Sequence, residues 1–226
     1  LVPVIAWRFG PWPASLLTLG LTTVGAFRAE FGVAVVDHHG VACACALMSV
    51  VFLAASGAGW LRGEKREGTF VAWLPIVSTA RRWLVASGIS GATGLWISAS
   101  TTVPVLIGIG VGALLAAWVA RTDRAVQTGV RFEPRLWRWW GCAGGGASLA
   151  FYALECFPGP FALRLEVNHP LYALAWMAAG DLILALRELT EHIRDLFRIA
   201  CVLRYDHDVI IEDRTIAFHL YRIAQE

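Results

Sequence analysis

Charged side chains are scarce in this sequence, and their scarcity excludes an ordinary soluble domain. Only 16% of the 226 residues are Asp, Glu, Lys or Arg, while 57% are hydrophobic; soluble chains carry about 25% charged residues. The formal net charge of +2 is too small for a nucleic-acid-binding surface, and the basic residues are spread between apolar segments. The composition therefore predicts a protein of the lipid bilayer that has no nucleic acid as a partner.

Features that would define other protein classes are also missing. The five cysteines are an odd number, and Cys43, Cys45 and Cys142 lie in apolar segments, where a thiol behaves as a small hydrophobic group. We expect no disulfide framework. The sequence contains no internal repeat and no low-complexity run. Because residue 1 is Leu, we expect the chain to begin downstream of its initiator methionine.

Long apolar runs are the dominant feature of the chain. A helix needs about 20 mostly apolar residues to cross a bilayer, or somewhat fewer where flanking residues reach the interface, and six stretches qualify. We therefore predict an all-α fold, with residues 1–187 forming a polytopic transmembrane helix bundle of about six spans. Residues 69–80 are shorter and contain Trp73 and Pro75, so we expect an interfacial segment there rather than a span. The predicted spans are residues 11–27, 33 or 37 to 60, 83–98, 101–120, 137–157 and 169–186.

The distribution of basic residues predicts the orientation of these spans. Residues 61–82, residues 121–138 and the carboxyl-terminal tail fall on one side of the membrane, and the loops on the opposite side hold only Arg28 and Arg164. The positive-inside rule then places both chain ends inside. The basic residues of the two inner loops are Arg62, Lys65, Arg66, Arg81, Arg82, Arg121, Arg124, Arg131, Arg135 and Arg138.

Residues 188–226 have the composition of a soluble segment. An amphipathic helix is expected over residues 189–203, and residues 209–211 and 215–223 are rich in strand-forming side chains. A tail of this length rarely folds alone. We therefore expect it to dock on the basic loops of the same chain or on a partner protein, and other membrane subunits are the expected partners.

Small residues recur at the spacing that lets helices approach closely. Gly108 and Gly112 lie four residues apart in one predicted span, and Gly141 and Gly145 do so in another. Such pairs allow close helix contact inside a membrane. We favour packing within the bundle of the same chain over an interface between chains for both pairs.

Several polar residues are predicted to meet where spans end on the outer side. Histidine and carboxylate side chains are ligands of catalytic zinc, and ionisable residues at membrane depth are functional candidates. The competing interpretation, which we favour, is that Asp37 and Asn168 cap helices and that the histidines are interfacial. The metal-ligand candidates are Asp37, His38, His39, Glu155 and His169.

The order of the spans, together with Asp37 and His169, resembles the last six helices of the seven-helix alkaline ceramidase-like superfamily, which includes adiponectin-receptor-like proteins. Members carry Ser-x-x-x-His at the end of the second helix, Asp at the start of the third and His-x-x-x-His at the start of the seventh. The resemblance implies three zinc-binding histidines and the hydrolysis of lipid amides.

This chain departs from the family's motifs at most of their positions. Asp37 matches the aspartate and His169 matches the first histidine of the last pair. Ala173 stands at the second, and the early serine and histidine positions fall near Thr22 and Ala26. Within the resemblance, the chain is a divergent member that kept the bundle and lost the chemistry.

Two functions remain open at this point. The first is a non-catalytic accessory or scaffold subunit of a larger membrane complex, without a cofactor. The second is a zinc-dependent hydrolase of lipid amides, in which the metal activates a water molecule. A transporter is less favoured because the helices lack the paired interruptions of such folds, and Asp181 is interpreted as an interior hydrogen-bonding residue.

Overall fold

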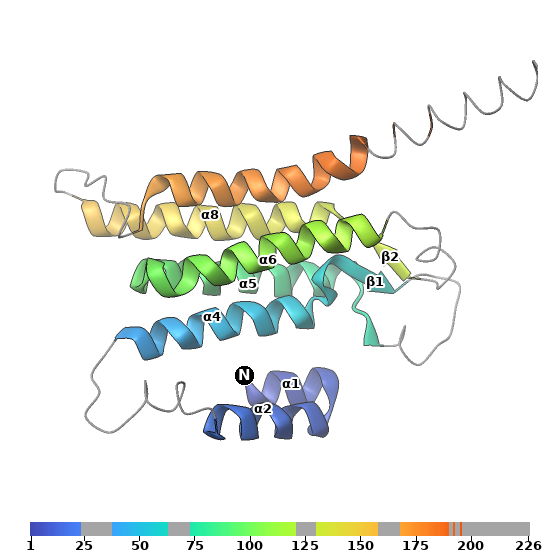
Figure 1. Ribbon diagram of the computed structural model, residues 1–226, viewed down its shortest axis with the longest axis horizontal. Coiled ribbons are helices and arrows are strands. Elements are labelled where there is room, and N and C mark those ends of the chain that lie inside the picture. The colour runs from blue at the N-terminus through green and yellow to red at the C-terminus, as the bar shows by residue number, and fades with distance from the viewer. Residues whose placement is uncertain are drawn as a thin grey trace, which may run out of the picture. The chain divides into compact units, whose positions relative to one another are not determined.

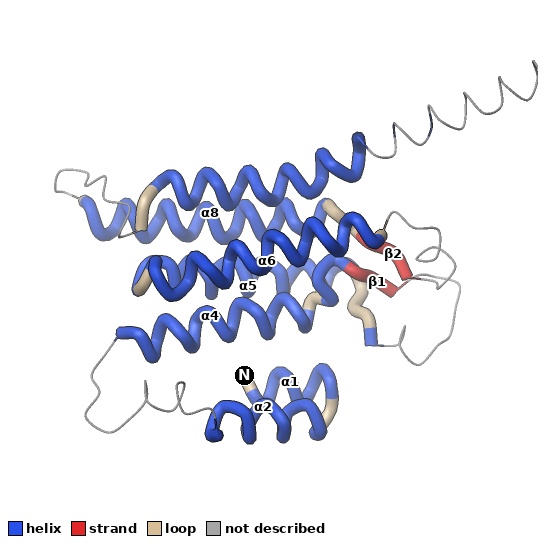
Figure 2. Tube along the Cα trace, viewed as in Figure 1, coloured by secondary structure: helices blue, strands red, loops and turns tan. Residues whose placement is uncertain are grey.

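The computed structural model confirms a mostly helical chain (Figures 1 and 2). It describes residues 1–23, 38–62, 73–120, 130–157 and 168–189, with positions 192 and 195. The chain divides into two compact units, Leu1–Leu184 and Ala185–Glu226. The helices are α1 (Val2–Phe9), α2 (Pro11–Thr23), α4 (His38–Ala55), η1 (Gly57–Gly59), α5 (Val77–Ile97), α6 (Ala99–Val119), α8 (Arg135–Cys156) and a last helix, Pro170–Leu189.

Three of these helices are long and apolar enough to cross a membrane. They are α4, α6 and the last helix, with mean hydropathies of 1.7, 2.1 and 1.2. The α5 and α8 helices are of similar length, with 21 and 22 residues. The expected class of protein, a helical bundle with several candidate membrane spans, is therefore present.

The prediction of an interfacial segment over residues 69–80 is wrong in part. The α5 helix begins at Val77, so residues 77–80 belong to it, and the predicted start of this span at Trp83 lies too far along the chain. Pro75 and Ile76 precede the helix, and Ile76 has an extended backbone, as is usual for the residue just before a helix. Nothing in Arg81-Arg82 stops the helix, because arginine is a good helix former. Residues 69–72 lie outside the described residues.

The α5 helix packs against α4 on one side and α8 on the other. Toward α4, the Ser49 hydroxyl donates to the Ser87 carbonyl oxygen at 3.0 Å, and the Ser87 hydroxyl donates to the Ser49 carbonyl oxygen at 2.7 Å. Both serines are fully buried. Toward α8, a Cβ added at Gly88 would lie 2.8 Å from the Trp140 carbonyl oxygen. The two helices therefore approach as closely as their backbones allow.

The α8 helix packs in the same way against the last helix. A Cβ at Gly141 would lie 3.2 Å from the Gly180 Cα, and one at Gly145 would lie 2.7 Å from the Ala173 carbonyl oxygen. The predicted role of Gly141 and Gly145 in packing within the chain is confirmed. Gly108 and Gly112 differ, because a Cβ added at either would meet nothing within 4 Å.

A small two-stranded sheet lies at the end of the bundle where α4 ends and α5 and α8 begin. It pairs the segment that follows α4 with the segment that precedes α8. Strand β1 (Trp60–Arg62) pairs antiparallel with β2 (Val130–Phe132), with Leu61 opposite Arg131. Figure 1 shows both strands at that end.

The short helix α1 is tied to the same end of the bundle by Arg8. The Arg8 guanidinium donates to the carbonyl oxygens of Ala55, at 3.3 Å, and Trp73. Burial lowers the pKa of Arg8 from its ordinary value, although a guanidinium keeps its proton at any physiological pH. Between α1 and α2, Gly10 has φ +92°, a backbone conformation that favours glycine.

Candidate functional site

A buried polar contact fixes the start of the last helix against α8. The Ser148 hydroxyl donates to Asn168 Oδ1 at 2.7 Å, and Asn168 Nδ2 donates to the Ser148 carbonyl oxygen at 2.8 Å. Asn168 is 2% exposed and Ser148 is fully buried. Because its amide is used in this contact, Asn168 joins two helices rather than capping one, and the predicted capping role of Asn168 is wrong.

His169 caps the last helix instead. Its Nδ1 accepts a hydrogen bond at 3.0 Å from the backbone N–H of Leu171, one of the amides that lack a partner inside the helix. An imidazole nitrogen that accepts an N–H carries no proton, so the proton of the neutral ring lies on Nε2. A protonated nitrogen has no lone pair for a metal ion. His169 as placed therefore fits a capping role better than a zinc ligand.

The other candidate ligands that the structure describes lie on two elements, α4 and α8. His38 and His39 begin α4, with ring centroids 4.3 Å apart. Glu155 is exposed near the end of α8, and Asp37 lies outside the described residues. Within the described ranges, no three His, Cys, Asp or Glu side chains are grouped closely enough to hold a metal ion. Because the predicted set includes Asp37, it stays a prediction.

The positions that carry the family's other ligands are occupied differently here. Ala173 is fully buried, and its carbonyl oxygen faces Gly145. The Thr22 hydroxyl donates to the Thr18 and Leu19 carbonyl oxygens of its own helix, both at 3.0 Å. Ala26 lies outside the described residues. The two described positions therefore supply no metal-binding side chain.

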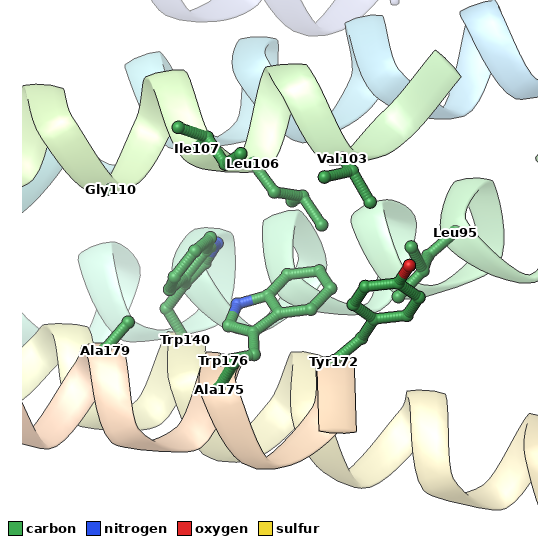
Figure 3. Close-up of a pocket in the computed structure, with 10 residues that line it drawn as sticks. All are labelled: Leu95, Val103, Leu106, Ile107, Gly110, Trp140, Tyr172, Ala175, Trp176 and Ala179. Atoms are coloured by element: carbon green, nitrogen blue, oxygen red, sulfur yellow. The ribbon is translucent and has the colours of Figure 1, made fainter. Parts of the chain in front are cut away.

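An apolar cavity of about 210 Å³ lies between α6 and the last helix, with α5 and α8 behind it (Figure 3). Trp140 and Trp176 lie beside one another in it, with ring centroids 5.0 Å apart. Their indole N–H groups are buried without a hydrogen-bond partner among the described residues, an arrangement that costs free energy in an apolar environment. The lining residues are Leu95, Val103, Leu106, Ile107, Gly110, Trp140, Tyr172, Ala175, Trp176 and Ala179.

A second apolar feature lies between α4 and α6. Two adjoining hollows, of about 540 and 440 Å³, share Val50 and Val105 in their linings. The first also touches α2, and the second is lined by Gly108 and Gly112. We call these two hollows together the α6 groove. It has the apolar walls and small residues on which another transmembrane helix can pack.

Asp181 does not have the interior position that its place in an apolar span predicts. Its side chain is 58% exposed, and its Oδ1 lies 3.1 Å from Nε of Arg138 on α8. The pair forms on the outer surface of the two helices, so the prediction of an interior hydrogen-bonding residue is wrong.

Sequence reasoning also missed Trp140 and Trp176 as lining residues of one cavity. A tryptophan in an apolar segment is most often an interfacial or core residue, so no sequence signal marks these two.

No family model, curated protein or solved structure matches the chain.

Proposed function

We propose that this chain is a non-catalytic polytopic membrane protein that serves as an accessory or scaffold subunit of a larger membrane complex. The observation that carries the proposal is the α6 groove, in which a glycine row at helix-packing spacing has no partner among the described residues. The same spacing on α8 is filled by a helix of the chain itself. The proposed occupant of the α6 groove is a transmembrane helix of another subunit.

The exposed face of α6 suits such a partner. Gly108 and Gly112 lie one turn apart and therefore on one face, and Ile107, Val111 and Leu115 beside them are 61%, 52% and 60% exposed. Lipid solvates these side chains as well as protein does, so they give no hydrophobic drive of their own. The missing glycine side chains supply the close approach that favours helix association in a bilayer.

We also propose six spans, formed by α2, α4, α5, α6, α8 and the last helix, with both chain ends inside. The gathering of Arg8, Arg62, Arg81, Arg131 and Arg138 near the β1–β2 end supports this orientation, since basic residues collect on the inner side of membrane proteins. The tail, residues 188–226, is proposed to dock on a partner.

The test is to fill the glycine row and look for lost partners. In Gly108→Leu/Gly112→Leu we expect the copurifying membrane subunits to fall at least tenfold, while the melting temperature of the chain itself does not fall, because the added side chains enter open space. Gly146→Leu is the control, since Gly146 on α8 also has nothing within 4 Å; it should keep both properties. A wild-type protein that mild detergent releases only as a monodisperse monomer would contradict the proposal.

A second candidate is the zinc-dependent hydrolase of lipid amides, as a divergent member of the ceramidase-like superfamily. The cavity in Figure 3 favours it, because an apolar cavity between helices suits a lipid chain. The capping geometry of His169 does not fit this role. Elemental analysis of wild type and His169→Ala decides between them. Zinc near one equivalent that is lost with the histidine would establish the hydrolase, and equal metal content would exclude it.

A further inference from the structure

The α5 and α8 helices run in the same direction and begin at the same end of the bundle. Arg81 contacts Trp139 near their starts, and Gly88 faces Gly144 further along both helices. Both helices lack an acidic residue in the first turn and a side chain that caps it. Their dipoles therefore place two partial positive charges side by side.

Three arginines lie near an exposed tryptophan at this end. The guanidinium carbon of Arg81 lies 5.2 Å from the centre of the Trp139 ring, and Trp139 is 50% exposed. Arg135 precedes Trp139 by four residues and so lies on the same face of α8, and Arg138 is its neighbour in the chain. We call Arg81, Arg135 and Arg138 the arginine patch. All three are exposed.

The charge of the arginine patch is only partly neutralised. Arg138 pairs with Asp181 at 3.1 Å, whereas nearby Glu133 pairs with Arg131. No acidic side chain of the described residues forms an ion pair with Arg81 or Arg135. These two guanidinium groups, one of them held against a tryptophan ring, are therefore available to an anion from outside the chain.

The location of the arginine patch favours one source of that anion. Asp181 belongs to the last helix, one of the three helices able to cross a membrane, so the Arg138–Asp181 pair places the patch beside a candidate span. An exposed tryptophan such as Trp139 is typical of the boundary between hydrocarbon and headgroups. Guanidinium groups bind phosphate oxygens through paired N–H donors, and basic pockets between helices bind anionic lipid headgroups.

We propose that the arginine patch binds the phosphate headgroup of an anionic membrane lipid. Arg81 and Arg135 contact the phosphate, Arg138 is kept in place by Asp181, and the exposed ring of Trp139 lies against the glycerol and upper acyl region of the lipid. This binding is independent of the partner proposed for the α6 groove, which lies between other helices.

The proposal is tested with the full chain in a neutral detergent, by titration with short-chain phosphatidylglycerol and detection by native mass spectrometry. Phosphatidylcholine of the same chain length and inorganic phosphate serve as comparison ligands. We expect saturable phosphatidylglycerol binding at least tenfold tighter than that of either comparison ligand. In Arg81→Gln/Arg135→Gln, the affinity should fall on the order of 30-fold, the equivalent of two lost basic contacts.

The control variant is Arg62→Gln, which removes an exposed arginine from strand β1, outside the patch. It should bind phosphatidylglycerol within twofold of wild type. The charge-retaining Arg81→Lys/Arg135→Lys should recover part of the affinity, because the charge is kept and the paired N–H donors are lost. A melting temperature equal to that of wild type shows that the double glutamine variant is folded. Equal affinities for the two lipids, equally tight binding of free phosphate, or an equal loss in Arg62→Gln would each overturn the proposal.

Discussion

Two glycine rows of the same spacing have opposite environments in this protein. On α8, Gly141 and Gly145 lie against the backbone of the last helix, and Gly144 beside them lies under the Trp176 ring. On α6, Gly108 and Gly112 have open space where a side chain would be. Both rows have two glycines four residues apart. This spacing predicts that another helix can approach closely, but it does not predict whether that helix belongs to the same chain.

The difference follows from what lies opposite each row. The last helix presents Ala173 and Gly180 to α8, so small residues meet small residues and the backbones come into contact. The α6 row faces the α6 groove, whose walls on α4 are the larger Val50 and Leu53. No helix of the described residues packs closely against the α6 row, and the proposed partner helix is the one that would do so.

The largest effect that tests this comparison is expected from a methyl group added on α8, where the glycines lie against the last helix. In Gly144→Ala the new Cβ would overlap Cε2 of the Trp176 ring, well inside van der Waals contact. Because Trp176 is 5% exposed and wedged between helices, we expect destabilisation of about 3 kcal/mol, measured by unfolding in mixed micelles. Gly146→Ala, with nothing within 4 Å, is the control. A stability of Gly144→Ala equal to that of the control would mean that α8 and the last helix are not in contact.

The polar contact at the end of the same interface should have the next largest effect. Asn168→Ala removes the acceptor of the Ser148 hydroxyl and leaves a cavity, so we expect a loss of about 1–3 kcal/mol in the free energy of unfolding. Ser148→Ala removes a hydroxyl and leaves the Asn168 Nδ2 bond to the backbone, so it should cost less. Unfolding of both single variants and the double variant measures the coupling energy. Strictly additive losses would show that the two side chains do not interact.

The helices and the filled glycine row of this interface were predictable from sequence, but its polar details were not. Apolar length identifies helices because each span must satisfy its own backbone, and Gly141 and Gly145 indicate close contact. Asn168 and His169 are both acceptable near a helix start. Because Ser148 on α8 lies next to Asn168, Asn168 forms the hydrogen bond between the two helices, and His169 caps the last helix.

Longer-range features were less accessible to sequence reasoning. An aspartate in an apolar run suggests an interior position, but Asp181 lies opposite Arg138 across the two helices, a relation that depends on how they are rotated. The same rotation brings Trp140 and Trp176 into one cavity. Helix rotation is set by packing against neighbours rather than by hydrophobicity, so hydropathy alone does not predict these contacts.

The smallest effect should come from a methyl group in the open row, and it should have the opposite sign. Gly108→Ala adds a Cβ that meets nothing within 4 Å, and alanine costs less backbone entropy in a helix than glycine. We therefore expect the isolated chain to gain about 0.4–1 kcal/mol in stability, measured as for Gly144→Ala. A loss instead of a gain would mean that part of this chain packs against Gly108. Since an added methyl group also holds a partner helix away, the same variant should bind its proposed partner more weakly, so that the stability of the chain and its assembly change in opposite directions.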